Sequence, residues 1–83
     1  MSEELKDRSA LVTKRKDLGV TQKQVASDLG ISRSFYGLIE TGRRDPSLGL
    51  AMELANYFET TIVDLFFNDY WVKFLNNNKV ILS

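Results

Sequence analysis

Apolar side chains recur every three or four positions from residue 3 to residue 67, the spacing that places them on one face of an α-helix. The pattern breaks at glycines and restarts after serine or threonine, which are preferred at helix N-caps. It predicts five helices, over residues 3–18, 22–29, 33–41, 48–59 and 62–67. The expected fold is therefore an all-α, five-helix domain that occupies residues 1–67.

The inward-facing positions of these helices define the expected core. They are small or large apolar residues at helical spacing, with one further plug residue after a turn: Leu5, Leu11, Val12, Leu18, Val25, Ala26, Leu29, Ile31, Tyr36, Ile39, Ala51, Leu54, Ala55 and Phe58. A chain this short buries only about 60% of its unfolded surface, so the expected core is modest.

The stretch from residue 20 to residue 42 carries the strongest local signals. Thr21 and Gln24 have the spacing of a capping box at the start of the second helix. Gly30 supplies the positive φ that a sharp turn needs, and Ser32 caps the helix that follows. Two helices joined by so short a turn cross at a large angle. The second can then project from the domain and enter a DNA major groove, which is about 12 Å wide.

Residues 68–83 have a different pattern. Residues 70–75 and 79–82 are rich in strand-forming side chains, and three consecutive asparagines between them are a turn signal. A short β-hairpin is one prediction, and a helix continuing from residue 68 to about residue 75 is the other. In either case the large apolar side chains must be covered, because their burial is worth several kcal/mol at about 25 cal/mol per Å². We expect this tail to pack on the domain or on a second copy of it.

Charge and composition restrict the function. The net charge of zero argues against nucleic-acid binding, but residues 14–44 hold seven basic and three acidic side chains. The absence of Cys and His removes thiolate chemistry, the commonest general base and the commonest metal ligand. No carboxylate pair is accompanied by a base, a nucleophile or a phosphate loop. We therefore expect a cytoplasmic protein that is not an enzyme, without cofactor, metal, small-molecule ligand or membrane partner.

Three segments together resemble the Cro/repressor helix-turn-helix family, also called XRE-like or lambda-repressor-like. They are TQKQVA at residues 21–26, LGISRS at residues 29–34 and IETGRRDPS at residues 39–47. The resemblance covers about residues 11–67. It implies a five-helix domain that binds double-stranded operator DNA, usually as a homodimer on a two-fold symmetric site.

The resemblance also implies roles for individual residues. Base contacts are expected from the outer side of helix 33–41, at Arg33, Ser34, Gly37 and Leu38. Phosphate contacts are expected at the start of the second helix and after the third, at Thr21, Gln22, Lys23, Thr41, Arg43 and Arg44. The guanidinium of Arg33 suits O6 and N7 of guanine, and Leu38 suits a thymine methyl group. Phe35 either packs between helices or contacts DNA.

Two further sets follow from the resemblance and the apolar pattern. Arg15 and Glu40 match an ion pair that links the first and third helices in some family members. A dimer interface is expected at Met52, Tyr57, Tyr70, Trp71, Val72 and Phe74. The sequence departs from the family pattern at Lys14, usually small and apolar, and at Gly49 and Met52, usually charged.

The sequence therefore predicts a DNA-binding transcriptional regulator, most simply a repressor, that reads operator DNA with helix 33–41. The alternative is a protein-interaction module, such as an antitoxin or a partner-binding regulator, in which DNA binding is secondary. The apolar tail motivates this alternative.

Overall fold

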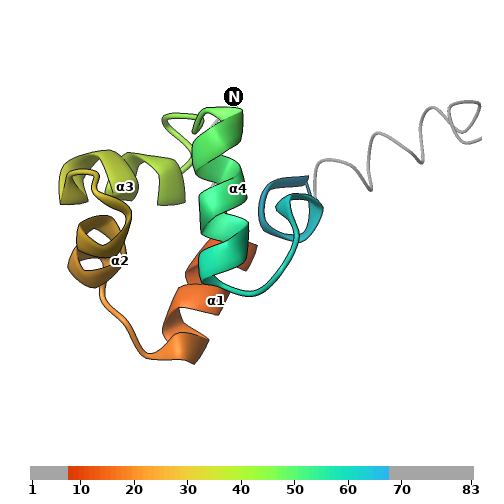
Figure 1. Cartoon of the computed structure of the whole chain (residues 1–83), viewed down its shortest axis with the longest axis horizontal. Coiled ribbons are helices and arrows are strands. Elements are labelled where there is room, and N and C mark those ends of the chain that lie inside the picture. The colour runs from red at the N-terminus through yellow and green to blue at the C-terminus, as the bar shows by residue number, and fades with distance from the viewer. Residues whose placement is uncertain (1–7, 68–83) are drawn as a thin grey trace, which may run out of the picture.

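The structure is a computed structural model and describes residues 8–67 (Figure 1). It contains α1 (Ser9–Leu18), α2 (Gln22–Leu29), α3 (Arg33–Glu40), α4 (Leu48–Tyr57) and η1 (Val63–Phe67), a short π-helix. The described part is all helical, which confirms the expected fold class. The predicted start of the first helix before residue 8 and the predicted hairpin or helix of the tail lie outside the described residues.

Side-chain caps begin α2, α3 and α4 as predicted. The hydroxyl of Thr21 accepts a hydrogen bond from the backbone N–H of Gln24 at 3.0 Å, and Ser32 and Ser47 cap α3 and α4 in the same way. The capping box itself is only half formed. The amide of Gln24 donates to Asp28 Oδ1 at 2.8 Å instead of turning back to Thr21, because Asp28 lies one helical turn along the same face.

Each of the four α-helices ends with one residue in the left-handed region. Gly19, Gly30 and Gly42 have φ of 77°, 74° and 79°, and Glu59 has φ of 55°. At each end the next residue donates its N–H five residues back, as Thr60 does to the carbonyl of Ala55 at 2.9 Å. The fourth helix therefore ends at Tyr57, two residues before the predicted end. The sequence did not mark this stop because glutamate is not a residue that favours positive φ.

The third helix ends one position before its predicted end. Helix α3 ends at Glu40, and Thr41 is its C-cap rather than its last residue. The last predicted helix, over residues 62–67, is found as η1, with the hydroxyl of Thr61 accepting from the N–H of Asp64.

The core forms where α1, α2, α3, α4 and η1 meet, and most predicted positions are confirmed. The buried apolar residues are Leu11, Val25, Ala26, Tyr36, Ile39, Ala51, Leu54, Ala55, Phe58 and Leu65. Val12 is half-buried, and Leu29 and Ile31 are half-buried and pack against this core. The prediction for Leu18 was wrong, since it is 54% exposed. Leu18 ends α1, and after the reversal at Gly19 it is Val20 that packs on the core.

Helix α3 lies at an edge of the described part, where it can contact other molecules (Figure 1). Helix α3 packs on α2 and on α1, while η1 packs on α1. Figure 1 shows α2 and α3 at one edge of the described part and η1 at the opposite edge. Within residues 8–67, no helix is both long and apolar enough to cross a membrane.

Candidate nucleic-acid interface

Helix α3 has one buried and one open side. Tyr36 and Ile39 are fully buried in the core. Arg33 and Ser34 are exposed, and Gly37 and Leu38 are half-buried. The four residues expected to contact bases therefore lie on the accessible part of a helix at the edge of the described part (Figure 1). Arg33 is the first residue of α3, and the N-terminal residues of a recognition helix are those that approach base edges.

The expected phosphate contacts fall into two groups. Thr21 and Lys23 are exposed at the start of α2, and Arg43 and Arg44 are exposed after α3. The loop after α3 is held by the carbonyl of Leu38. It accepts hydrogen bonds from the N–H groups of Arg43 at 2.9 Å and Arg44 at 3.2 Å. The backbone that carries the two arginines is thereby fixed to the end of α3.

Thr41 and Gln22 are engaged within the chain. The hydroxyl of Thr41 donates to the carbonyl of Leu38 at 3.1 Å, so this hydrogen is already used and phosphate offers only acceptors. The amide of Gln22 donates to Glu40 Oε1 at 2.9 Å. Its Oε1 would lie 3.6 Å from a Cβ placed on Gly37, so the Gln22 side chain lies against α3. It braces α3 and retains a second N–H for another acceptor.

A buried ion pair joins α1 to the end of α3. Arg15 Nε donates to Glu40 Oε2 at 2.5 Å and also reaches the carbonyl of Val20 through Nη1 at 3.0 Å. The Tyr36 hydroxyl donates to the same carboxylate at 2.8 Å. Glu40 is only 3% exposed. With the amide of Gln22 included, its carboxylate accepts hydrogen bonds from α1, α2 and α3. The structure thus brings together Arg15 and Glu40, as the family resemblance implies.

Hydrogen bonds decide the charge state of this cluster. Burial opposes ionisation of Glu40, but the hydrogen bonds from Arg15, Gln22 and Tyr36 outweigh burial and hold its pKa below the ordinary value. The hydrogen bond to Glu40 raises the pKa of Arg15. Burial, with the hydrogen bond to Glu40, raises the pKa of Tyr36. At neutral pH the cluster therefore contains a carboxylate, a guanidinium and a neutral phenol.

Phe35 belongs mainly to the packing of the domain. It is half-buried, packs against the core, and lies 5.8 Å from Cζ of Arg44 in cation–π geometry. Of the two roles that the sequence allowed, helix packing is the one that these contacts support. The same ring also limits where the Arg44 side chain lies.

The residues expected at a dimer interface are placed differently from one another. Met52 is 53% exposed on α4, one turn from Leu48, which is 71% exposed. Tyr57 is half-buried, and its hydroxyl donates to Asp28 Oδ2 at 2.6 Å. This hydrogen bond, with a smaller contribution from burial, raises the pKa of Tyr57 to about 12. Tyr57 thus ties α4 to α2 within the chain.

The other expected interface residues, Tyr70, Trp71, Val72 and Phe74, lie outside the described residues. Lys14 is half-buried and Gly49 is exposed.

Sequence reasoning missed Arg8, which contacts the end of α3 and the loop after it. Its Nε donates to the carbonyl of Ile39 at 3.0 Å, and its Nη2 pairs with Asp45 at 2.5 Å. The partners lie more than thirty positions away along the chain, and no local pattern marks them. An arginine directly before a helix, where acidic residues are favoured, was the one available hint.

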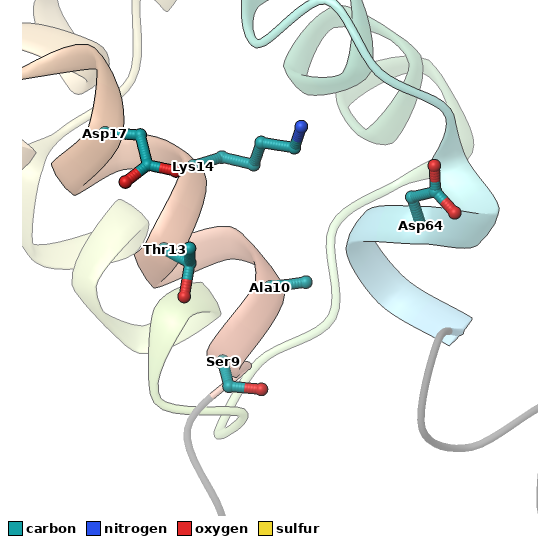
Figure 2. A pocket seen from close by; sticks show the side chains of 6 residues that line it. All are labelled: Ser9, Ala10, Thr13, Lys14, Asp17 and Asp64. Atoms are coloured by element: carbon teal, nitrogen blue, oxygen red, sulfur yellow. The ribbon is translucent and has the colours of Figure 1, made fainter.

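A recess lies between α1 and η1 (Figure 2). It has a volume of about 400 Å³ and is lined by Ser9, Ala10, Thr13, Lys14, Asp17 and Asp64. In Figure 2 the Lys14 side chain extends toward the space between the two helices. The recess is open to solvent and contains none of the residues assigned to base or phosphate contacts.

Comparisons with known proteins agree with this geometry. A helix-turn-helix family model matches residues 11–65, more than half of the chain. An HTH-type transcriptional regulator of Methanocaldococcus jannaschii is 45% identical over 47 residues, which cover 57% of this chain and 71% of that protein. One of Archaeoglobus fulgidus is 38% identical over 55 residues, or 66% of this chain and 79% of that protein.

A solved structure shares the fold. The restriction-modification controller protein C.AhdI from Aeromonas hydrophila is similar with a TM-score of 0.62 and 31% identity, over 70% of this chain and 84% of that one. The family match over residues 11–65 and the exposed outer side of α3 agree with this likeness. The chain belongs to the helix-turn-helix family of DNA-binding transcriptional regulators.

Proposed function

We propose that the protein represses transcription by binding double-stranded operator DNA as a homodimer, with α3 of each copy in the major groove. The observation that carries this proposal is the two-sided character of α3. Its inner residues Tyr36 and Ile39 are fully buried, which fixes the helix, while Arg33 and Ser34 on the outer side are exposed. A regulator of this kind acts in the cytoplasm, where the operator is.

Base reading is assigned to the outer side of α3. The guanidinium of Arg33 presents a planar fork of donors that matches O6 and N7 of guanine. Ser34 can bond either a base or a phosphate, and Leu38 can contact a thymine methyl group. Gly37 has no side chain, so the groove wall can approach the helix backbone there.

Phosphate anchoring is assigned to the two groups that flank α3. Lys23 and the N-terminal end of α2 form one group, with Thr21 and Gln22, while Arg43 and Arg44 form the other. Thr41 is left out because its hydroxyl already donates to the carbonyl of Leu38. These contacts supply affinity and register rather than sequence choice. They also make affinity fall steeply as the salt concentration rises, because bound phosphates release their counterions.

Selection of bound duplexes from a random DNA pool tests the proposal most directly. We expect a two-fold symmetric consensus whose half-sites have centres about 34 Å apart, or a multiple of that distance. A consensus without symmetry would contradict the dimer. A pool that remains random after repeated selection, or a protein that retains no DNA at low salt, would contradict the proposed function itself.

The apolar surface of α4 supports a homodimer. Leu48 and Met52 are both more than half exposed and lie one helical turn apart. Large apolar side chains gathered on a small surface are typical of protein contacts. Residues 68–83 remain a proposed part of the same interface or of its packing.

Replacing both Leu48 and Met52 by lysine should convert the dimer to a monomer, because four like charges would face one another across the two-fold axis. Sedimentation velocity should show the mass fall by half, and operator affinity should fall by at least about tenfold since the two half-sites are no longer bound as one unit. Glu53→Gln, an exposed change on the same helix, is the control. A double variant that sediments like the wild-type dimer would place the interface elsewhere.

A further inference from the structure

Arg8 connects three parts of the molecule that are distant in sequence. Its Nε donates to the carbonyl of Ile39 at 3.0 Å, and its backbone N–H donates to the carbonyl of Glu40 at 2.7 Å. Its Nη2 reaches Asp45 Oδ1 at 2.5 Å and the carbonyl of Arg44 at 3.5 Å. Its Cζ lies 5.2 Å from the centre of the Phe66 ring in η1. The Arg8 side chain is 17% exposed. Its contact with Ile39 is partly buried, while its contacts with Arg44 and Asp45 lie at the surface.

These contacts satisfy the C-terminal end of α3. The last carbonyls of a helix lack partners within it and carry partial negative charge, so a guanidinium there is favourable. Arg8 takes two such positions, one through its side chain and one through its backbone. The last carbonyls of the proposed recognition helix are thus hydrogen-bonded by a residue that precedes α1.

The same guanidinium holds the far end of the loop that carries the phosphate anchors. The near end is fixed by the N–H groups of Arg43 and Arg44, which donate to the Leu38 carbonyl. The far end is fixed where Nη2 of Arg8 meets the Arg44 carbonyl and the Asp45 carboxylate. The backbone of Arg44 is therefore restrained on both sides, while its guanidinium lies over Phe35.

The carboxylate of Asp45 is unexpected beside the proposed phosphate anchors. Its side chain is 87% exposed and directly follows two arginines assigned to phosphate contacts. A carboxylate at that place repels DNA by simple electrostatics. Its partner Arg8 both offsets this charge and uses it as an attachment point for the loop.

We propose that Arg8 and Asp45 are positioning residues for DNA binding, which together hold Arg43 and Arg44 in the geometry that meets the phosphate backbone. The proposal rests on the proposed function. It assigns to an acidic residue beside the DNA a role that strengthens binding, and it gives Arg8 a role that depends on its planar fork and not on its charge alone.

The decisive variant is Asp45→Asn, because charge repulsion alone and positioning of the loop predict opposite changes in DNA affinity. Removal of a carboxylate beside phosphates should tighten binding if electrostatics alone matters. Loss of the attachment point should instead weaken binding by about three- to tenfold, the range expected for one partly exposed ion pair present in each half of a dimer. The measurement is fluorescence anisotropy with a selected operator duplex and with a mixed-sequence duplex. Binding to the two duplexes should be weakened to the same degree, since phosphate contacts do not depend on sequence.

Two further variants separate positioning from a general loss of stability. Arg8→Lys keeps the charge but cannot bridge a carbonyl and a carboxylate with a fixed fork, so it should weaken binding to the same degree. Arg44→Ala should cost less affinity in the Asp45→Asn background than in the wild type, because a displaced Arg44 contributes less. A purely structural role would lower the melting temperature and leave the cost of Arg44→Ala unchanged.

Glu53→Gln on α4 is the control for net charge and should not weaken binding. Tighter binding by Asp45→Asn, or wild-type affinity in Arg8→Lys, would overturn the proposal while leaving the proposed function intact. Absence of DNA binding by the wild-type chain would instead overturn the proposed function. The two failures are therefore distinguishable in one series of titrations.

Discussion

Replacing Glu40 by alanine should lower the free energy of unfolding by about 3–5 kcal/mol, the usual cost of removing one partner from a buried ion pair. Arg15 would keep its charge with its side chain only 14% exposed. The donors of Gln22 and Tyr36 would also lose their acceptor. Small domains have total stabilities of roughly 5–15 kcal/mol, so the variant should be near the limit of folding at 25 °C. Urea denaturation followed by circular dichroism measures this loss.

A double variant provides the matched control. Arg15→Met combined with Glu40→Leu removes both charges and fills their space with apolar groups, which is often neutral or stabilising for buried pairs. It should be more stable than Glu40→Ala, although the hydroxyl of Tyr36 still lacks its partner. If Glu40→Ala lost less than about 1 kcal/mol, the pair would have to be solvated in solution, contrary to the 3% exposure of Glu40.

The same cluster sets a direction for the pH dependence of stability. The pKa of Glu40 is lower in the folded chain than in the unfolded chain. Its contribution is therefore fully present above its unfolded pKa of about 4.3 and is lost as the pH falls through the folded value. The Arg15→Met, Glu40→Leu variant should lack this part of the acid sensitivity, which gives the Glu40 assignment a second measurement.

The fold could be predicted because its signals are local. Every helix start after α1 has a side chain whose hydroxyl accepts from an N–H three residues later, at Thr21, Ser32, Ser47 and Thr61. Three of the four helix ends have glycine, which adopts positive φ without a steric cost. The fourth end was misplaced because Glu59 adopts the same conformation without the matching residue type. The N–H of Thr60 closes that turn by donating to the carbonyl of Ala55.

The candidate site likewise has some features that the local sequence predicts and others that it does not. The outer and inner sides of α3 follow from helical periodicity alone, so the exposure of Arg33 and the burial of Tyr36 could be predicted. The Arg15–Glu40 pair was available only through family resemblance, since 25 positions separate the two residues. For Arg8 the only hint was its place directly before a helix, which does not identify its partners. Contacts between distant segments require the packed structure, because sequence spacing does not report which helix ends meet.

Replacing Arg33 by alanine should abolish most discrimination at one base pair of each half-site, because no other fork of donors stands at the start of α3. A bidentate contact to guanine is worth about 1–3 kcal/mol against the wrong base, and a two-fold symmetric dimer loses it twice. Competition titrations with operators changed at each position should show the preference vanish at one symmetric pair of positions. Binding to a mixed-sequence duplex should fall much less, since phosphate contacts remain.

Arg33→Lys and Arg43→Ala distinguish base reading from charge. Lysine keeps the charge of Arg33 but not its planar fork. Arg33→Lys should therefore retain affinity for mixed-sequence DNA and show a weaker base preference than the wild type, because an ammonium reaches O6 and N7 of guanine without a fixed geometry. Arg43→Ala should weaken binding to all sequences alike and reduce the salt slope by about one unit for each copy. If Arg33→Ala instead behaved like Arg43→Ala, Arg33 would be a phosphate anchor. The reading of sequence would then fall to Ser34 and Leu38, whose short side chains approach bases only when α3 lies deep in the groove.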